Sequence, residues 1–278
     1  MTTPAAASSL SPLTPAAASV RGRFLWYDLM VPDVDAAIRF YAAVTGWTTA
    51  PWGTAGEGSP YTMWMNGASP IGGVMTQTSA ETAGGVPPYW MAHIGTPDVD
   101  ATYRDALALG ARSFVAPSDI PDVGRFAIVS DPQGAVFSMF QPSNPSPAPS
   151  PMPAVGEFSW HELPTIDPTS TFDFYARLFG WEKTEAMPMG PAGVYQMFGQ
   201  AGTTYGAVYP SAASNRPSQW LLYVRVGDLT RALDAVRQGG GQVLREPTPV
   251  PGGQIAHCAD PHGAHFALHE ATAPEAQG

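Results

Sequence analysis

The chain repeats one pattern four times, and this repeat constrains the fold more than any other feature. The pentapeptide PDVDA occurs at residues 32–36 and again at 97–101, each time after an apolar run and before a helical pattern that ends in glycine. Weaker versions of the same junction stand at Asp167 and Asp228. Such repeats indicate duplicated supersecondary units that must pack together to bury a core.

A stronger twofold repeat lies within the fourfold one. The segment FYAAVTGW at 40–47 returns as FYARLFGW at 174–181, and DPQG at 131–134 returns as DPHG at 260–263. A chain of 278 residues has room for two domains. We therefore expect two modules and three connecting or terminal segments: a disordered tail at 1–21, a first module at 22–142, a Pro/Ser linker at 143–154, a second module at 155–272 and a C-terminal tail at 273–278.

Each quarter of the chain predicts a strand, a helix and three further strands. An aspartate stands where each helix would begin, and its carboxylate can accept hydrogen bonds from the free helical N–H groups. The predicted helices are 34–44, 99–109, 168–178 and 229–238. One βαβββ unit leaves a face of its sheet uncovered, so two units must pair to enclose a cavity. The expected class is α+β.

Composition excludes several classes of partner. The net charge is −10, only 13% of residues are charged, and Lys183 is the single lysine. Without a basic stripe, nucleic acid and anionic membrane surfaces are excluded as partners. The chain has neither an apolar run long enough to span a membrane nor a signal-peptide pattern. The single cysteine, Cys258, excludes an internal disulfide, and we expect a cytoplasmic protein.

The paired βαβββ units, with FY…GW near the start of each module and DPxG near its end, resemble the vicinal oxygen chelate (VOC) superfamily. That superfamily includes glyoxalase I, extradiol dioxygenases, and fosfomycin- and bleomycin-resistance proteins. The resemblance covers 22–142 and 155–272 and is greatest to the duplicated bacterial glyoxalase/bleomycin-resistance-like proteins. It implies two tandem modules, each a curved mixed sheet that encloses a cavity, with helices outside.

The resemblance also implies one divalent metal inside the curved sheet. Its usual ligands are His or Gln on the first strand, His on the strand that opens the second half, and Glu on the last strand. Carried over residue by residue, these positions hold side chains that do not ligate a divalent cation in the usual way. They are Trp26, Met91 and Ser138 in the first module, and Trp160, Leu221 and Ala267 in the second. We therefore assign no metal ligand.

Polar side chains lie two residues beyond several of these positions, on the same strand face. They are Asp28 and His93 in the first module, and Glu162, Tyr223 and His269 in the second. A carboxylate beside a histidine suits a general base, or two ligands of a displaced Zn, Ni, Mn or Fe site. The alternative is that the two carboxylates satisfy buried backbone groups. His161 lies on the face opposite Glu162 and is expected to pack beneath a helix.

Large side chains on the strands are candidates for substrate binding, although filling the core is an equal alternative for several of them. The candidates are Trp26, Tyr61, Met63, Trp90, Trp160, Tyr195 and Trp220.

Two functions remain open from the sequence. The first is a small-molecule lyase, isomerase or cyclase that works by acid–base chemistry, with the first module favoured. The alternative is a non-catalytic protein that sequesters a drug or metabolite, as bleomycin-resistance proteins do. Two modules in one chain form an internal pseudo-dimer, so a monomer suffices, with a homodimer as the alternative.

Overall fold

Two mixed sheets of eight strands form the protein. The computed structural model describes residues 20–52, 61–144, 152–211 and 218–272. The strand order of the first sheet is β2-β3-β4-β1-β5-β8-β7-β6, and that of the second is β10-β11-β12-β9-β13-β16-β15-β14. The first sheet comprises β1 (Phe24–Val31), β2 (Thr48–Pro51), β3 (Thr62–Asn66), β4 (Ser69–Thr76), β5 (Tyr89–Gly95), β6 (Arg112–Ile120), β7 (Gly124–Ser130) and β8 (Val136–Pro142). The second comprises β9 (Phe158–Thr165), β10 (Glu182–Pro188), β11 (Val194–Gln200), β12 (Thr203–Pro210), β13 (Leu221–Arg225), β14 (Gln242–Val250), β15 (Gly253–Ala259) and β16 (His265–Ala271).

Four helices follow the opening strands of the four repeat units, so the expected α+β fold with two tandem modules is confirmed. They are α2 (Val34–Thr45), α4 (Val99–Ala108), α5 (Pro168–Phe179) and α6 (Leu229–Gln238). A short helix α3 (Ser79–Ala83) and a 3₁₀ turn η1 (Gly190–Ala192) are additional elements that the repeat did not predict. No helix in the described ranges is long and apolar enough to cross a membrane.

Each of the four helices begins at the predicted aspartate. Asp33 accepts from Ala36 N at 2.9 Å, and Asp167 accepts from both Thr169 N and Ser170 N. The duplicated helices α2 and α5 end at Gly46, with φ of 80°, a conformation that glycine adopts without strain, and at the corresponding Gly180. The local signals in the sequence therefore place each helix at the same point in its repeat.

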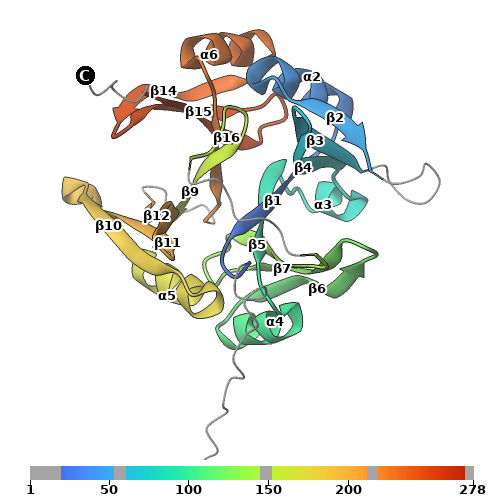
Figure 1. Cartoon of the computed structure of the whole chain (residues 1–278), viewed down its shortest axis with the longest axis vertical. Helices are drawn as coiled ribbons and strands as arrows, with labels where there is room; N and C mark the ends of the chain where they lie inside the picture. The colour runs from blue at the N-terminus through green and yellow to red at the C-terminus, as the bar shows by residue number, and fades with distance from the viewer. Residues whose placement is uncertain (1–19, 53–60, 145–151, 212–217, 273–278) are drawn as a thin grey trace, which may run out of the picture.

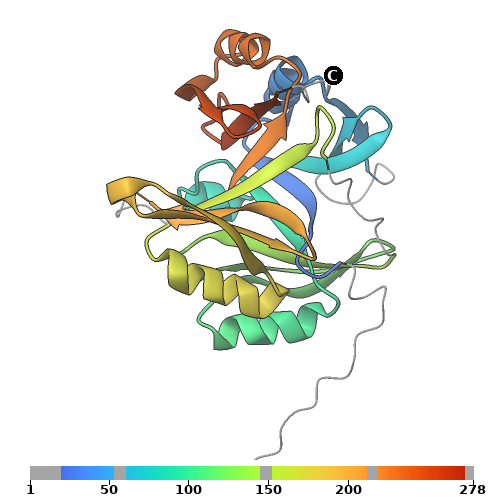
Figure 2. The same ribbon diagram turned by 60° about the vertical axis from the view of Figure 1, so that its left-hand side comes forward.

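Helices from different modules lie side by side. Helix α2 lies next to α6, and α4 lies next to α5, in both views (Figures 1 and 2). The hydrophobic core is continuous between the modules; for example, Phe40 of α2 packs edge-on against Phe266 of β16. The modules thus share one core instead of merely touching.

The duplicated motifs meet across the two modules. The Tyr41 hydroxyl, in the first FY motif, donates to Asp260 of the DPHG turn at 3.4 Å. The Tyr175 hydroxyl, in the second FY motif, donates to Asp131 of the DPQG turn at 3.3 Å. Each module therefore supplies a helix tyrosine that contacts the closing turn of the other.

The tryptophans of the GW motifs make a second exchange. Trp47 Nε1 donates to the carbonyl of Gly156 at 2.7 Å, and Trp181 Nε1 donates to the carbonyl of Gly22 at 2.7 Å. Arg21 also donates to the carbonyl of Leu178, near the C-terminal end of α5. Arg21 and the buried Val20 fall in the segment expected to be a disordered tail, but both pack against the folded part of the chain. Residues 1–19, 145–151 and 273–278 lie outside the described residues.

The opening strands β1 and β9 also pack on each other, through their convex faces. Phe24 stacks on His161 with ring centroids 3.6 Å apart, and the Tyr27 hydroxyl donates to His161 Nε2 at 2.7 Å. Burial lowers the pKa of His161 to about 4, so its ring is neutral and Nδ1–H donates to the Tyr205 carbonyl. His161 therefore packs in the seam between the modules and not beneath a helix, which corrects the expectation from sequence.

Two buried tryptophans test the contribution of the exchanged hydrogen bonds. Trp47 and Trp64 are both fully buried, but Trp64 Nε1 has no hydrogen-bond partner among the described residues. Trp47→Phe leaves the Gly156 carbonyl without its donor, whereas Trp64→Phe removes an N–H that is already unpaired. We expect Trp47→Phe to lower the free energy of unfolding by about 1–2 kcal/mol more than Trp64→Phe, measured by urea denaturation. Equal losses would show that the exchanged bond contributes nothing beyond packing.

Candidate active site

A cluster of four polar and aromatic side chains stands on the concave face of the first sheet. His93 Nε2 lies 2.9 Å from one Asp28 oxygen, and the Tyr61 hydroxyl donates to the other oxygen at 2.7 Å. Trp26 Nε1 donates to the same oxygen as Tyr61, at 3.1 Å. Asp28 and His93 are each 7% exposed, so this hydrogen-bonded pair is almost dehydrated.

Strand register and a glycine bring this cluster together. In the antiparallel pairing of β1 with β5, Trp26 is opposite His93 and Asp28 is opposite Met91, so Asp28 and His93 are diagonal neighbours on one face. Gly73 of β4 pairs with Asp28 on its other side. A side chain at Gly73 would collide with the Tyr61 hydroxyl. The missing side chain therefore gives Tyr61 access to Asp28.

The surroundings of Asp28 favour its ionised form. Burial by itself raises the pKa of Asp28, but the charge and hydrogen bond of His93, with the bonds from Tyr61 and Trp26, together hold that pKa below its usual value. An ionised carboxylate only accepts hydrogen bonds, so His93 carries its proton on Nε2. His93 Nδ1 is then the nitrogen that can take up a proton.

The second sheet carries a related cluster around Glu162. The Tyr195 hydroxyl donates to one Glu162 oxygen at 2.6 Å, and the Tyr209 hydroxyl donates to the other at 3.0 Å. Trp160 Nε1 donates to the Tyr195 oxygen at 2.7 Å. The neighbouring Tyr223 also lowers the pKa of Glu162. The set Trp160, Glu162 and Tyr195 thus repeats the arrangement of Trp26, Asp28 and Tyr61.

The two carboxylates differ in charge environment. Tyr223 occupies the position in the second module that His93 occupies in the first, and its hydroxyl is hydrogen-bonded with His257 Nε2 at 2.8 Å. Burial raises the pKa of Glu162, and the tyrosine bonds only partly offset this effect. Among the described residues, no basic side chain forms an ion pair with Glu162. The carboxyl in the second module is therefore the more easily protonated of the two.

Most of the candidate residues predicted from sequence lie in these two clusters. Met63 also faces the concave side, since it pairs with Gly73. His269 does not reach Glu162. On β13, Glu162 pairs with Leu221, whereas His269 pairs with Arg225, and these two partners are four residues apart. Its Nδ1 is instead 3.2 Å from the Ser159 hydroxyl.

Trp90 and Trp220 need correction, because they do not line a cavity. Each is buried on the convex face, and its Nε1 donates to the hydroxyl of a helix tyrosine: Trp90 to Tyr41 at 2.9 Å and Trp220 to Tyr175 at 3.2 Å. The reason is alternation, since Trp90 precedes Met91, which faces the same side as His93. Sequence reasoning also missed Tyr209, although alternation from Ala207, the partner of Glu162, could have identified it.

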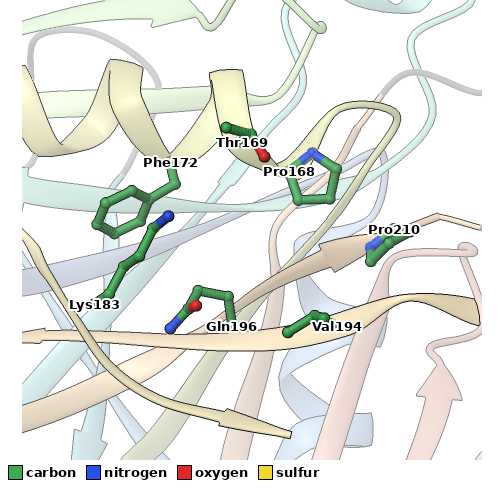
Figure 3. Close-up of a pocket in the computed structure, with 7 residues that line it drawn as sticks. All are labelled: Pro168, Thr169, Phe172, Lys183, Val194, Gln196 and Pro210. Carbon is green, nitrogen blue, oxygen red and sulfur yellow. The ribbon is translucent and has the colours of Figure 1, made fainter. Parts of the chain in front are cut away.

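A hollow of about 330 Å³ lies away from both clusters. It is formed where the start of α5 faces β10, β11 and β12 (Figure 3). The Lys183 ammonium lies 5.0 Å from the centre of the Phe172 ring there. None of the cluster residues lines it; the lining residues are Pro168, Thr169, Phe172, Lys183, Val194, Gln196 and Pro210.

Both halves of the chain match known family models. Residues 157–268 match the model of the glyoxalase/bleomycin resistance protein/dioxygenase superfamily, and residues 26–140 match a glyoxalase-like domain. The two matches together include both clusters.

Relatives match nearly the whole chain. CFP32 of Mycobacterium tuberculosis, named a putative glyoxylase, is 27% identical over 244 residues, which cover 87% of this chain and 92% of that protein. DnrV of Streptomyces peucetius, named an anthracycline biosynthesis protein, is 28% identical over 262 residues, which cover 88% and 92%. The Mn(II)-bound glyoxalase from Novosphingobium aromaticivorans shares the fold, with a TM-score of 0.62 and 14% identity over 91% of this chain and 83% of that one.

The residues at the metal positions of such relatives do not fit a divalent metal. The positions carried over from the VOC resemblance hold Trp26, Met91 and Ser138 in the first sheet, and none of these is a usual ligand. In the part of the chain that the structure describes, no three His, Cys, Asp or Glu side chains converge to hold a metal ion. Asp28 and His93 alone offer two ligands, which is too few for a structural or catalytic site.

The hydrogen-bonded Asp28 carboxylate predicts a stability difference that depends on pH. The folded-state pKa of Asp28 is below its ordinary value of 3.8, so its charge stabilises the fold above that pH, and the contribution is lost as pH falls through the folded-state pKa. Asp28→Asn should therefore lower the free energy of unfolding by about 2 kcal/mol near pH 7. Urea titrations of both proteins at successively lower pH should show this gap closing below pH 3.8. A gap that is constant with pH would contradict the ionised assignment.

For Glu162 we predict a pH dependence of stability with the opposite sign to that of Asp28. Its folded-state pKa is above its ordinary value of 4.5, so the fold loses stability as pH rises from 4.5 through the folded-state pKa. Glu162→Gln does not titrate, so we expect this variant to be more stable than the wild type near pH 7 and equal to it near pH 4. Thermal unfolding across this range measures the difference. Glu185→Gln, on the exposed strand β10, is the matched control and should change little.

Proposed function

The chain belongs to the glyoxalase/bleomycin resistance protein/dioxygenase superfamily, and from this premise we propose that its first module is the active site of a small-molecule enzyme. The proposed reaction is a proton transfer of the lyase, isomerase or cyclase class. The observation that carries the proposal is the buried pair of Asp28 and His93, 2.9 Å apart on the concave face.

The pair has the features of a general base. Asp28 accepts a hydrogen bond from His93 Nε2–H and so orients the ring. His93 Nδ1 then removes a proton from a carbon next to a substrate carbonyl. The imidazolium that forms is stabilised by the adjacent carboxylate and returns the proton to the product. A positioned base of this kind contributes about 10²- to 10⁴-fold to the rate. Tyr61 and Trp26 hold the other carboxylate oxygen, so they act as positioning residues.

An enolisable carbonyl compound with a flat aromatic part is the substrate class that we infer. Trp26 and Tyr61 are partly exposed beside the base and offer apolar ring surface. A relative that matches nearly the whole chain is named for anthracycline biosynthesis, which supports an aromatic ketone. Another relative carries a glyoxylase name, which supports a smaller carbonyl compound. Both alternatives share the acidic C–H that the base requires.

Sequestration without turnover is the second candidate function. The superfamily to which the chain belongs includes bleomycin resistance proteins. The tyrosines and tryptophans on both concave faces favour it, because aromatic surfaces hold flat ligands without any chemistry. The two functions differ in one observable: an enzyme exchanges the substrate proton with solvent, whereas a sequestering protein only binds.

Deuterium exchange tests the proposal. We expect the wild type to catalyse exchange in D₂O at the α-carbon of 2-tetralone, or of the hemithioacetal of methylglyoxal with glutathione, followed by NMR. Asp28→Asn and His93→Gln should each lower the catalysed exchange about 10²-fold or more, because the base is lost or misoriented.

Glu162→Gln is the matched control and should keep the catalysed exchange. No exchange above the buffer rate with either compound, combined with saturable binding by calorimetry, would favour sequestration over catalysis. Exchange lost in Glu162→Gln and kept in Asp28→Asn would move the active site to the second module and overturn the proposal.

A further inference from the structure

The cluster around Glu162 has no role in the proposed reaction. Glu162 is 6% exposed and accepts hydrogen bonds from the hydroxyls of Tyr195 on β11 and Tyr209 on β12. A buried carboxyl held in this way is costly unless a positive charge or a proton compensates it. The two clusters differ in the group that compensates the charge of the buried carboxylate.

In the described part of the chain, no basic side chain forms an ion pair with Glu162. Burial, with Arg245 and His265, lowers the pKa of His257 to about 4, so its ring is neutral near pH 7. Burial and Arg225 also lower the pKa of His269. The charge of Arg245 lowers the pKa of Glu162, but this arginine is exposed on β14, donates its Nε–H to Thr248 and forms no ion pair with Glu162. Asp28, by contrast, has His93 in direct contact.

The groups around Glu162 are those that bind organic cations elsewhere. Trp160, Tyr195 and Tyr209 are partly exposed on the concave face, so a ligand can reach their rings. The Tyr195 and Tyr209 rings lie 5.3 Å apart and both point their hydroxyls at the carboxylate. Aromatic rings attract ammonium groups through the negative charge of their faces, and a carboxylate among them supplies the counter-ion.

We propose that the concave face of the second module binds an organic cation, a primary to quaternary amine, whose ammonium group pairs with Glu162 between Trp160, Tyr195 and Tyr209. The amine supplies the positive charge that no side chain pairs with Glu162, and its apolar part lies against the indole of Trp160. This site is separate from the base in the first module and does not depend on the proposed enzymatic function.

Calorimetry with three matched probes tests the site. Benzylamine, which is protonated near pH 7, should bind with one saturable site per chain. Benzyl alcohol has the same shape without the charge, and benzoate has the opposite charge; neither should bind measurably. Equal binding of benzyl alcohol would overturn the proposal, because the aromatic surface alone would then account for it. Absence of benzylamine binding to the wild type would also overturn it.

Variants locate the binding. Glu162→Gln should raise the Kd for benzylamine about tenfold or more, because it removes the counter-ion and keeps the shape. Glu185→Gln, which changes an exposed carboxylate on β10, should leave the Kd unchanged, and thermal unfolding of Glu162→Gln should show that the module is folded. Asp28→Asn should leave the Kd unchanged. Binding that survives in Glu162→Gln, or that is lost in Asp28→Asn, would place the amine elsewhere and contradict the proposal.

Discussion

The exchange of side chains between the FY helices and the closing turns is the interaction on which the rest of the structure depends. Asp260 accepts from the backbone N–H groups of His262 and Ala264 within its own turn and from Tyr41 of the other module. Asp131 makes the equivalent bonds with its own turn and with Tyr175. Each aspartate therefore closes a turn and connects two modules at once. Because this exchange buries the convex faces against each other, the two concave faces remain available for ligands.

The two contacts between an FY helix and a closing turn differ in their hydrogen bonds, although the same repeat builds both. Gln133 of the DPQG turn binds the start of α5 through Asp167 N, Thr165 and Thr171. His262 takes the place of Gln133 in the DPHG turn, and its Nε2 is buried without a hydrogen-bond partner among the described residues. At the repeat positions equivalent to Thr165, Ser170 and Thr171, the first module has Val31, Ala36 and Ala37. The loss of these three hydroxyls accounts for the unpaired nitrogen. The contact at the DPHG turn is therefore less polar than the contact at the DPQG turn.

The structural features that depend on local pattern could be predicted from the sequence. The features that depend on the register between distant strands could not. The capping aspartates and the glycines after the helices signal within a few residues, so the units and their order could be predicted. Alternation placed Asp28 and His93 on one face because each lies on a strand that opens a half-module. The same alternation puts Trp90, which precedes Met91, on the opposite face. His269 was expected beside Glu162 and is not, since its distance from Glu162 depends on the pairing of β13 with β16, which no local pattern specifies.

One difference between the repeats, His93 in the first and Tyr223 in the second, accounts for most of the chemical difference between the modules. In both modules the indole donates to the phenol oxygen and the phenol donates to the carboxylate, so the scaffold of each cluster is repeated within the chain. A histidine at the fourth position compensates the carboxylate with a group that exchanges protons, which suits catalysis. A tyrosine there gives the carboxylate another neutral donor, and burial then favours its protonated form. The same duplicated framework thus holds a carboxylate with a lowered pKa in one module and a carboxyl with a raised pKa in the other, and the two different sites that we propose follow from this difference.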